Sequence, residues 1–369
     1  MTEKLKTLLH ERAEHVDFAT PDVDALTRAG DRTIRRRRGI VGLASLASVA
    51  IVGALVATAF TGSSTPDGAP TADDPAGTDR SLSWSVGAFI HDGGATVDTG
   101  HEINAYVETS VGYVIADPDG TVWSVRDGQV TEIGRVDTKY PRLVADPTSP
   151  WVAWVDASNQ GSPSFFAFDQ ESLESQSFGS GTSTSGGTLA DEKDPTYAYA
   201  LDGTTLYLRD TRGAVALDLA SGTEKVVDPT ARNGFDVVTV HDGLIASRTD
   251  TGTRIGRTTK DGYVLDQAYG STGSFSPDGS YYTSDADEPS VWDLSTKQKL
   301  PVPGLDGYYF ATGYAWLDDD TLAVIAAKKE TAPAELLTCE IPAGTCTSEV
   351  ELSTFEHIDF RLPSGEGIE

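Results

Sequence analysis

Turn-forming residues recur at near-equal intervals from residue 81 to the end of this 369-residue chain. Short runs rich in Val, Tyr, Phe, Trp, Leu and Thr alternate with them. Asp-Gly, the strongest short-range signal of a β-hairpin, begins at eight positions in this part of the chain. Helical periodicity is almost absent there. Residues 81–369 are therefore predicted to be all-β.

The spacing of equivalent turns predicts the architecture of this region. The first hairpin turn of each group of about four strands is placed near Ser110, Thr148, Asp202, Asp242, Asp278 and Asp319. Successive turns are 38, 54, 40, 36 and 41 residues apart, and the long interval contains a Gly- and Ser-rich stretch, 179–188, that we expect to be a loop. A period near 40 residues with four strands in each unit is typical of one blade of a β-propeller.

The number of blades follows from what the repeats leave over. Six units fill residues 101 to about 352, and two strand-like segments remain, at 84–99 and 355–362. We expect these two ends to share a seventh blade, because a closed ring removes exposed sheet edges. A six-bladed ring with loose ends and an eight-bladed ring are the alternatives. A shared blade implies that loss of either end destabilises the whole domain.

An uncharged run of 22 residues, 39–60, precedes this domain and is rich in Ala, Val, Leu and Ile. A helix of that length, at about 1.5 Å per residue, crosses the ~30 Å hydrocarbon core of a bilayer. Four basic residues come directly before it: Arg35, Arg36, Arg37 and Arg38. The positive-inside rule then predicts a cytoplasmic N-terminus and an extracytoplasmic C-terminal domain in the cell membrane. The alternatives are a buried core helix and a signal peptide cleaved after Ala57-Thr58-Ala59.

Two segments of different composition flank this predicted transmembrane helix. Residues 1–38 carry apolar side chains at helical spacing and a Thr20-Pro21 helix start, which predicts a short helical cytoplasmic segment. Residues 61–80 contain no large apolar side chain, which predicts a flexible linker. The expected order is a cytoplasmic segment at 1–38, a single span at 39–60, a linker at 61–80 and an extracytoplasmic propeller at 81–369.

The chain is strongly acidic, with 28 Lys and Arg against 56 Asp and Glu and a net charge of -28. Residues 81–369 hold 18 basic and 45 acidic side chains, so the domain alone has a net charge of -27. A surface this negative repels phosphate backbones. Nucleic acid is therefore not expected as a partner.

The two cysteines, Cys339 and Cys346, flank a predicted hairpin turn at Pro342-Ala343-Gly344. The turn would place both sulfurs on neighbouring strands, and the compartment outside the membrane is oxidising. We expect a structural disulfide, which closes a short loop and contributes about 2 kcal/mol. A metal site would need further ligands, and no histidine lies close in the sequence.

The unit around Asp278 resembles the Trp-Asp repeat and TolB-like propeller superfamily. The matching residues are Phe275-Ser276-Pro277-Asp278-Gly279 and Val291-Trp292-Asp293-Leu294. Other units match more loosely, and the Gly-His pair of the full signature is missing. The layout of the whole chain also looks like that of a group of actinobacterial single-pass membrane proteins of unassigned activity. The resemblance implies a propeller fold and brings no particular function with it.

No catalytic, cofactor-binding or metal-binding residues are predicted. The six histidines, His10, His15, His91, His101, His241 and His357, form no HExxH-type pair. The Ser-rich stretch at 180–185 lacks the strand-turn-helix context of a nucleophilic serine. Neighbouring acids at Asp285 and Asp287 and at 318–320 are expected in hairpin turns rather than as paired catalytic carboxylates or calcium ligands. Five tryptophans, Trp123, Trp151, Trp154, Trp292 and Trp316, are expected to pack on strands.

These observations favour a membrane-anchored binding platform for a protein, peptide or glycan outside the cell. A second hypothesis is a signalling protein whose cytoplasmic segment holds a regulator such as a sigma factor. The weakest hypothesis is a hydrolase or lyase that uses acidic residues at the centre of the propeller, so the protein is not expected to be an enzyme.

Overall fold

The computed structural model describes the residues 80–138, 141–156, 164–179, 196–231, 236–266, 273–284 and 290–367. They belong to the second of two units into which the chain divides, Ala72–Glu369. The predicted cytoplasmic segment, with Arg35, Arg36, Arg37 and Arg38, lies outside the described residues. The predicted span at 39–60 and nearly all of the predicted linker also lie outside them, so these assignments stay predictions. Within the described ranges, no helix is both long and apolar enough to cross a bilayer.

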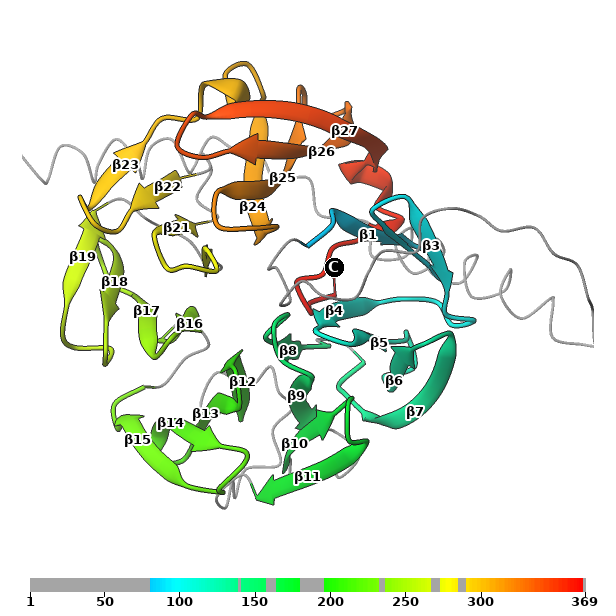
Figure 1. Ribbon diagram of the computed structural model, residues 1–369, viewed down its shortest axis with the longest axis vertical. Helices are drawn as coiled ribbons and strands as arrows, with labels where there is room; N and C mark the ends of the chain where they lie inside the picture. The colour runs from blue at the N-terminus through cyan, green and yellow to red at the C-terminus, as the bar shows by residue number, and fades with distance from the viewer. Residues whose placement is uncertain are drawn as a thin grey trace, which may run out of the picture. The chain divides into compact units, whose positions relative to one another are not determined.

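The described residues form seven antiparallel sheets of four strands each, arranged in a ring (Figure 1). Blade 1 contains β4 (Ala105–Thr109), β5 (Gly112–Ala116), β6 (Thr121–Arg126) and β7 (Gln129–Arg135). Blade 2 contains β8 (Leu143–Ala145), β9 (Trp151–Asp156), β10 (Ser164–Asp169) and β11 (Glu174–Gly179). Blade 3 contains β12 (Tyr197–Asp202), β13 (Thr205–Asp210), β14 (Gly213–Asp218) and β15 (Glu224–Asp228).

The next three blades follow in chain order. Blade 4 contains β16 (Thr239–His241), β17 (Leu244–Arg248), β18 (Gly252–Gly256) and β19 (Tyr263–Asp266). Blade 5 contains β20 (Gly273–Phe275), β21 (Tyr281–Ser284), β22 (Ser290–Asp293) and β23 (Gln298–Leu300). Blade 6 contains β24 (Phe310–Trp316), β25 (Thr321–Ala327), β26 (Pro333–Glu340) and β27 (Thr345–Thr354), preceded by the short 3-10 helix η1 (Pro303–Leu305). The prediction of an all-β propeller is confirmed, and each of the six predicted turns joins the first two strands of a blade.

The seventh blade combines both ends of the domain, as predicted. It contains β1 (Ser83–Val86), β2 (Phe89–Asp92) and β3 (Ala95–Asp98) with β28 (Phe360–Arg361), in the order β28-β1-β2-β3. Val86 lies opposite Phe360 in the antiparallel pairing of β1 and β28. Seven blades are therefore confirmed, and the six- and eight-bladed alternatives are wrong.

The C-terminal contribution to this blade is shorter than the predicted strand at 355–362. Its first part is a 3-10 helix, η2 (Phe355–His357), rather than a strand. The ring of Phe355 lies against the rings of Phe310 and Phe360, with centroids 5.5 and 6.3 Å away. Burying this aromatic side chain turns the backbone out of the extended conformation, so that only Phe360 and Arg361 pair with β1.

The hydrophobic core lies between neighbouring blades. Val114 of blade 1, for example, shares a buried cluster with Trp154 and Phe168 of blade 2. Trp154 is fully buried, and its indole Nε1–H donates to the Arg135 carbonyl at 3.0 Å. Both faces of the strands are covered in this way, which explains why the sequence shows apolar runs more often than strict alternation. All five tryptophans predicted on strands lie on strands.

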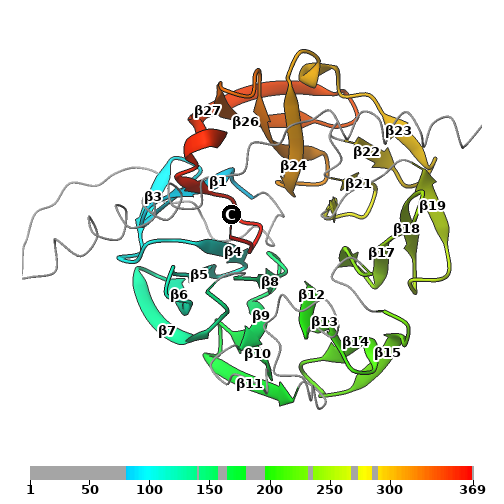
Figure 2. The same ribbon diagram turned by 180° about the vertical axis from the view of Figure 1, so that it is seen from behind.

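The C-terminal tail beyond β28 runs across the inner strands of blades 1 and 2, near the centre of the ring (Figures 1 and 2). Gly365, with a φ of +73°, donates its N–H to the Tyr106 carbonyl at 2.9 Å and accepts from the Leu143 N–H at 2.8 Å. The next residue, Glu366, forms an ion pair with Arg142. Arg142 also donates to the carbonyls of Ala198 and Tyr199 in blade 3.

The N-terminal end of the domain is fastened by Arg80. Its backbone N–H donates to the carbonyl of Leu317, just after β24, at 2.7 Å. Its Nη1 donates to the carbonyl of Trp316, the last residue of β24, at 3.1 Å. Its Nε donates to Glu108 of blade 1 at 2.9 Å. We call the seventh blade, Arg80 and the tail 362–367 the seam, because together they close the ring.

Candidate functional site

One face of the ring carries the turns between the first and second strands of blades 1 to 6 and between the third and fourth strands of all seven blades. We call it the turn face. In an antiparallel sheet these two turns lie at the same end of the strands. Two of its turns, Asp127-Gly128 and Asp242-Gly243, have positive φ at both positions, as a two-residue hairpin of this type requires.

Polar contacts link the turn face from blade 2 to blade 4. The carboxylate of Asp146 accepts from the Gly203 N–H at 2.7 Å, which joins blades 2 and 3. The carboxylate of Asp202 accepts from the N–H groups of Asp242 and Gly243 at 3.1 and 2.8 Å, which joins blades 3 and 4. The acidic turn residues thus hold adjacent blades in place.

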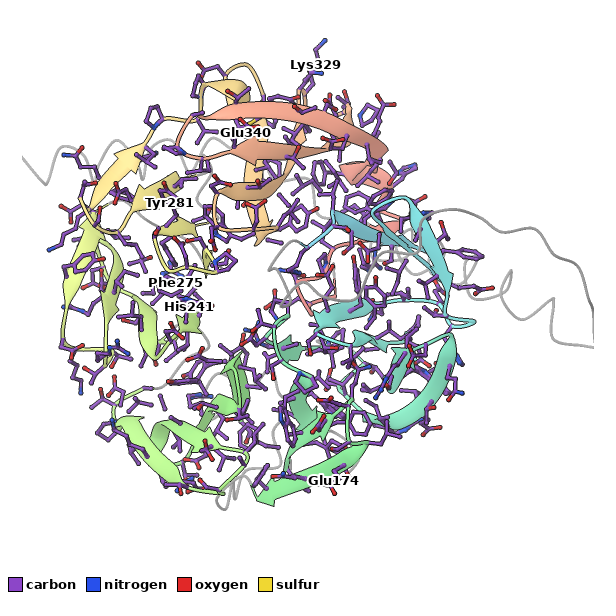
Figure 3. The ribbon with its side chains drawn as sticks, in the orientation of Figure 1. Glu174, His241, Phe275, Tyr281, Lys329 and Glu340 are labelled. Carbon is purple, nitrogen blue, oxygen red and sulfur yellow. A yellow bond between two sulfur atoms is a disulfide. The ribbon has the colours of Figure 1, made fainter. Side chains whose placement is uncertain are left out.

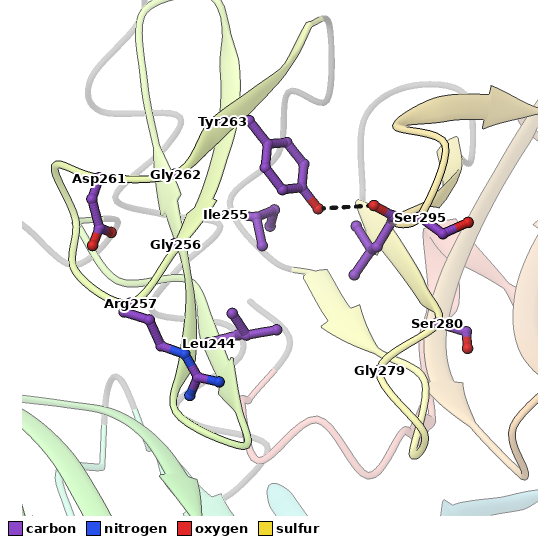
Figure 4. Close-up of a pocket in the computed structure, with 11 residues that line it drawn as sticks. Leu244, Ile255, Gly256, Arg257, Asp261, Gly262, Tyr263, Gly279, Ser280 and Ser295 are labelled. Atoms are coloured by element: carbon purple, nitrogen blue, oxygen red, sulfur yellow. Dashed lines mark hydrogen bonds between the residues drawn. The ribbon is translucent and has the colours of Figure 1, made fainter.

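The junction of blades 4 and 5 differs, because a pocket of about 530 Å³ opens there on the turn face (Figure 4). The side chains of Leu244, Ile255 and Leu294 and the ring of Tyr263 supply its apolar surface. Four polar residues, Arg257, Asp261, Ser280 and Ser295, and three glycines, Gly256, Gly262 and Gly279, complete the lining. Gly262 has a φ of +85°, and a Cβ there would meet the Ile255 carbonyl oxygen at 1.9 Å, so the close approach of β18 and β19 requires a glycine.

Few polar contacts cross this pocket. Tyr263 donates its Oη–H to the Leu294 carbonyl at 3.3 Å, which joins blades 4 and 5 (Figure 4). The Lys297 ammonium lies 4.4 Å from the centroid of the Tyr263 ring. Burial and the nearby Asp293 carboxylate raise the pKa of Tyr263, so its phenol stays a neutral donor.

Three carboxylates lie in the turns around the pocket, and hydrogen bonds keep them ionised. The backbone N–H of Thr258 lowers the pKa of Asp261. The hydroxyl and N–H groups of residues 295 and 296 lower the pKa of Asp293. Burial opposes ionisation of Asp278, but hydrogen bonds from its serine neighbours lower its pKa overall. The surroundings of the pocket are therefore negative at neutral pH.

The predicted cysteine pair lies in blade 6. Cys339 of β26 and Cys346 of β27 are directly opposite each other, with Cα atoms 4.0 Å apart, and a disulfide joins their sulfurs. Both cysteines lie away from the pocket, so they contribute to the fold and not to this site.

The described histidines lie in separate parts of the ring. His91 stacks on Trp84, His101 stacks on Trp123, and His241 lies 6.0 Å from the ring of Phe275 (Figure 3). His357 belongs to η2, and His10 and His15 lie outside the described residues. Within the described ranges, no group of three or more His, Cys, Asp or Glu side chains is placed to hold a metal ion.

The neighbouring acidic residues that the sequence places in hairpin turns are described only in part. Asp318 accepts from the N–H groups of Asp320 and Thr321 at 3.0 and 2.6 Å, which confirms its predicted place in a hairpin turn. Asp285 and Asp287, together with the Ser-rich stretch at 180–185, lie outside the described residues.

Sequence reasoning did not find the pocket. Arg257 and Tyr263 flank the Asp261-Gly262 turn, and Leu294 belongs to the quoted Val291-Trp292-Asp293-Leu294 motif. No local pattern distinguishes these residues from those of other turns, because the pocket results from the distance between two blades. Of the sequence patterns described above, the repeat unit around Asp278 lies nearest to the pocket.

No protein-family model matches the sequence, and no curated protein matches it. A solved structure from an analysis of two prolyl endopeptidases is similar, with a TM-score of 0.52 and 12% identity over 78% of this chain and 51% of that one. This chain thus spans about half the length of that chain. A chain of a mitotic checkpoint complex gives a TM-score of 0.47 and 10% identity, over 77% of this chain and 88% of that chain.

TolB from Acinetobacter baumannii gives a TM-score of 0.40 and 12% identity, over 78% of this chain and 67% of that chain. At these identities the likeness to the prolyl endopeptidase shows a shared propeller fold and nothing about activity. The two lower scores add no further argument.

Proposed function

We propose that this protein is a membrane-anchored binding platform whose propeller lies outside the cell and holds a segment of a partner protein on the turn face. The observation that carries the proposal is the pocket between blades 4 and 5. Its volume, about 530 Å³, is in the range of ligand-binding clefts, and its apolar surface with a polar rim suits a bulky apolar side chain.

The rest of the ring supports this role. Buried clusters and polar turn contacts join blades 1 to 4. A further buried cluster spans blades 4 and 5 and includes the pocket residues Leu244, Tyr263 and Leu294. The ionised carboxylates of Asp261, Asp278 and Asp293 favour a partner segment that carries positive charge.

A substitution that fills the pocket tests the proposal. Random heptapeptides displayed on phage are selected on the full-length chain, and their affinities are compared between two variants. Ser280→Trp places a large ring at the mouth of the pocket. Thr204→Trp is the matched control, because Thr204 follows the turn glycine of blade 3 as Ser280 follows that of blade 5. Both carbonyls accept from the N–H of the residue just after the third strand, Leu219 or Leu294.

The expected result is a set of peptides that share a bulky apolar residue and lose at least tenfold in affinity for Ser280→Trp but not for Thr204→Trp. Selection of no peptide, or equal binding to both variants, contradicts the proposal.

The membrane part of the proposal rests on the uncharged run at 39–60 and on the four arginines before it. A reporter fused after Glu369 tests it. Activity of an extracytoplasmic reporter such as alkaline phosphatase supports the proposed topology, and activity of a cytosolic reporter at that position contradicts it. The alternative role for residues 1–38, binding of a cytoplasmic regulator, depends on the same topology and stays a prediction.

A further inference from the structure

Four blades use the same turn between their third and fourth strands. In each turn a backbone carbonyl accepts from the N–H four residues later, and that later residue has a positive φ. The four residues are Leu173 (+63°), Gly222 (+69°), Lys297 (+61°) and Gly344 (+70°). Their hydrogen bonds to residues 169, 218, 293 and 340 are 2.7 to 2.8 Å long. The geometry of the turn therefore sets the backbone conformation at this position.

Glycine is the residue best suited to a positive φ, and blades 3 and 6 use it. A residue with a Cβ pays a conformational penalty there. At Lys297 a side-chain contact explains why the residue is not glycine, since its ammonium lies over the ring of Tyr263. Leu173 is 67% exposed, so burial in the folded chain does not offset its penalty. An exposed leucine in this conformation points to a role outside the fold.

Leu173 borders a second opening on the turn face, between blades 1 and 2. This groove has a volume of about 590 Å³ and is distinct from the pocket between blades 4 and 5. Phe168 and Ile133 supply further apolar surface beside Leu173. Phe168 is 6% exposed and Ile133 is partly covered by the neighbouring blade, so Leu173 is the most exposed of the three apolar side chains that line the groove.

The charges beside the groove are mainly negative. Glu132 and Glu171 line it, and Glu174 follows directly after Leu173 (Figure 3). The carboxylates of these three residues form no hydrogen bond or ion pair with any described residue. The one cation in the lining, Arg126, already donates to the carbonyls of residues 170 and 171 and pairs with Asp127.

We propose that this groove, here called the Leu173 groove, is a second interaction surface that binds a positively charged protein segment through one of its apolar side chains. The apolar side chain would contact Leu173, Phe168 and Ile133, and the cations beside it would face Glu132, Glu171 and Glu174. The net charge of -27 on residues 81–369 adds a long-range attraction for such a segment. This surface does not depend on the pocket between blades 4 and 5.

The test uses the full-length chain with ¹³C-labelled leucine methyl groups and three synthetic peptides. The probe is acetyl-Lys-Lys-Phe-Lys-Lys-amide, and the controls replace its Phe by Gly or its four Lys by Glu. We expect a saturable shift of the Leu173 methyl resonances with the probe alone. No shift with the probe, or an equal shift with either control peptide, overturns the proposal.

Two variants separate a binding role from a structural one. Leu173→Gly relieves the backbone penalty, so we expect the melting temperature to rise by about 1–2 °C while affinity for the probe falls at least fivefold. Gly222→Leu introduces the same penalty in blade 3, so we expect a lower melting temperature and unchanged affinity. Unchanged affinity in Leu173→Gly, or a fall in its melting temperature, overturns the proposal. These affinities are measured in chains that also carry Ser280→Trp, because the probe matches the partner proposed for the other pocket and this variant fills only that pocket.

Discussion

The seam and the junction of blades 4 and 5 are both contacts between neighbouring sheets, but they are built differently. At the seam, Arg80 contacts blades 6 and 1, β28 pairs with β1, and residues 362–367 bond to blades 1 and 2. At the junction of blades 4 and 5, the described residues share a buried apolar cluster that includes Ile255, Phe275 and Trp292, with a hydrogen bond of 3.3 Å from Tyr263 to Leu294 and a pocket on the turn face.

The difference follows from chain connectivity. The paired residues Ser85 and Arg361 are 276 residues apart, and closing a loop of that length costs about 5 kcal/mol in its length-dependent part. Blades 4 and 5 are joined by a short connection from Asp266 to Gly273, for which the same term is about 2 kcal/mol. Non-covalent contacts must therefore hold the seam, whereas the other junction tolerates a pocket.

The largest expected effect is at the seam. Phe360 is 1% exposed and belongs to β28, the strand that the C-terminal end contributes to the seventh blade. Phe360→Ala should lower the free energy of unfolding by about 3–5 kcal/mol, because it removes a buried ring and leaves a cavity. Urea denaturation measures this. The matched control is Phe89→Ala in the same blade, where the side chain is 44% exposed and the expected loss is about 1 kcal/mol or less. Equal losses of stability in the two variants would contradict the view that β28 is needed to close the ring.

A smaller loss is expected from Arg80. Its partner Glu108 has a side chain that is only 12% exposed, so Arg80→Met leaves a nearly buried carboxylate without its cation. We expect a loss of about 2–3 kcal/mol in the free energy of unfolding. The carboxylate of Glu335 is also 12% exposed, but its cation Lys328 is 60% exposed, against 22% for Arg80, and Glu335 keeps hydrogen bonds from Tyr308 and Ser348. Lys328→Met should therefore cost less than about 1 kcal/mol. If both variants lose the same amount, Arg80 is an ordinary surface residue and not part of the seam.

The junction of blades 3 and 4 should be sensitive to acid. Burial opposes ionisation of Asp228, but hydrogen bonds from Thr259 and Thr230 and the nearby Lys260 lower its pKa to about 2. Its ordinary pKa is about 3.8, so ionisation contributes about 2 kcal/mol of stability above pH 4–5, and this is lost as the pH falls through about 2. Stability measured from pH 7 to pH 2 should fall less steeply for Asp228→Asn. An equal loss of stability between pH 7 and pH 2 in the two proteins would contradict this.

The smallest effect is expected at the pocket. Tyr263→Phe removes the 3.3 Å hydrogen bond to Leu294 and keeps the ring that Lys297 covers. We expect less than about 1 kcal/mol of lost stability, because the bond is long and the phenol lies at an open pocket. Thermal unfolding measures the change. A loss as large as that of Arg80→Met would mean that blades 4 and 5 are held as firmly as the seam.

The fold could be predicted from the sequence because the blade is a local unit. Turn signals near residues 110, 148, 202, 242, 278 and 319 recur at the length of four strands, and the leftover segments at either end give the seventh blade. The turn predicted near Asp278 lies between β20 and β21. Each of these patterns depends on neighbours within about 40 residues, which a sequence shows directly.

The candidate sites could not be predicted in the same way. Leu173 and Gly222 hold equivalent positions with the same backbone conformation, and each follows an Asp by four residues and a Ser directly. This spacing marks the turn but not the groove beside it. The pocket depends on side chains of Leu244 and Leu294 from different blades. The C-terminal contacts of Gly365 with Tyr106 and Leu143 join residues more than 200 positions apart. Such contacts appear only once the ring is assembled.

Hydrogen–deuterium exchange of the full-length chain tests most directly whether the ring is firmly closed at the seam and loosest between blades 4 and 5. The amides of β1 and β28 should exchange as slowly as those in the inner strands of blades 1 and 2. The paired amides of β19 and β22, on either side of the pocket, should exchange sooner. Exchange at β1 and β28 ahead of β19 and β22 would contradict the account.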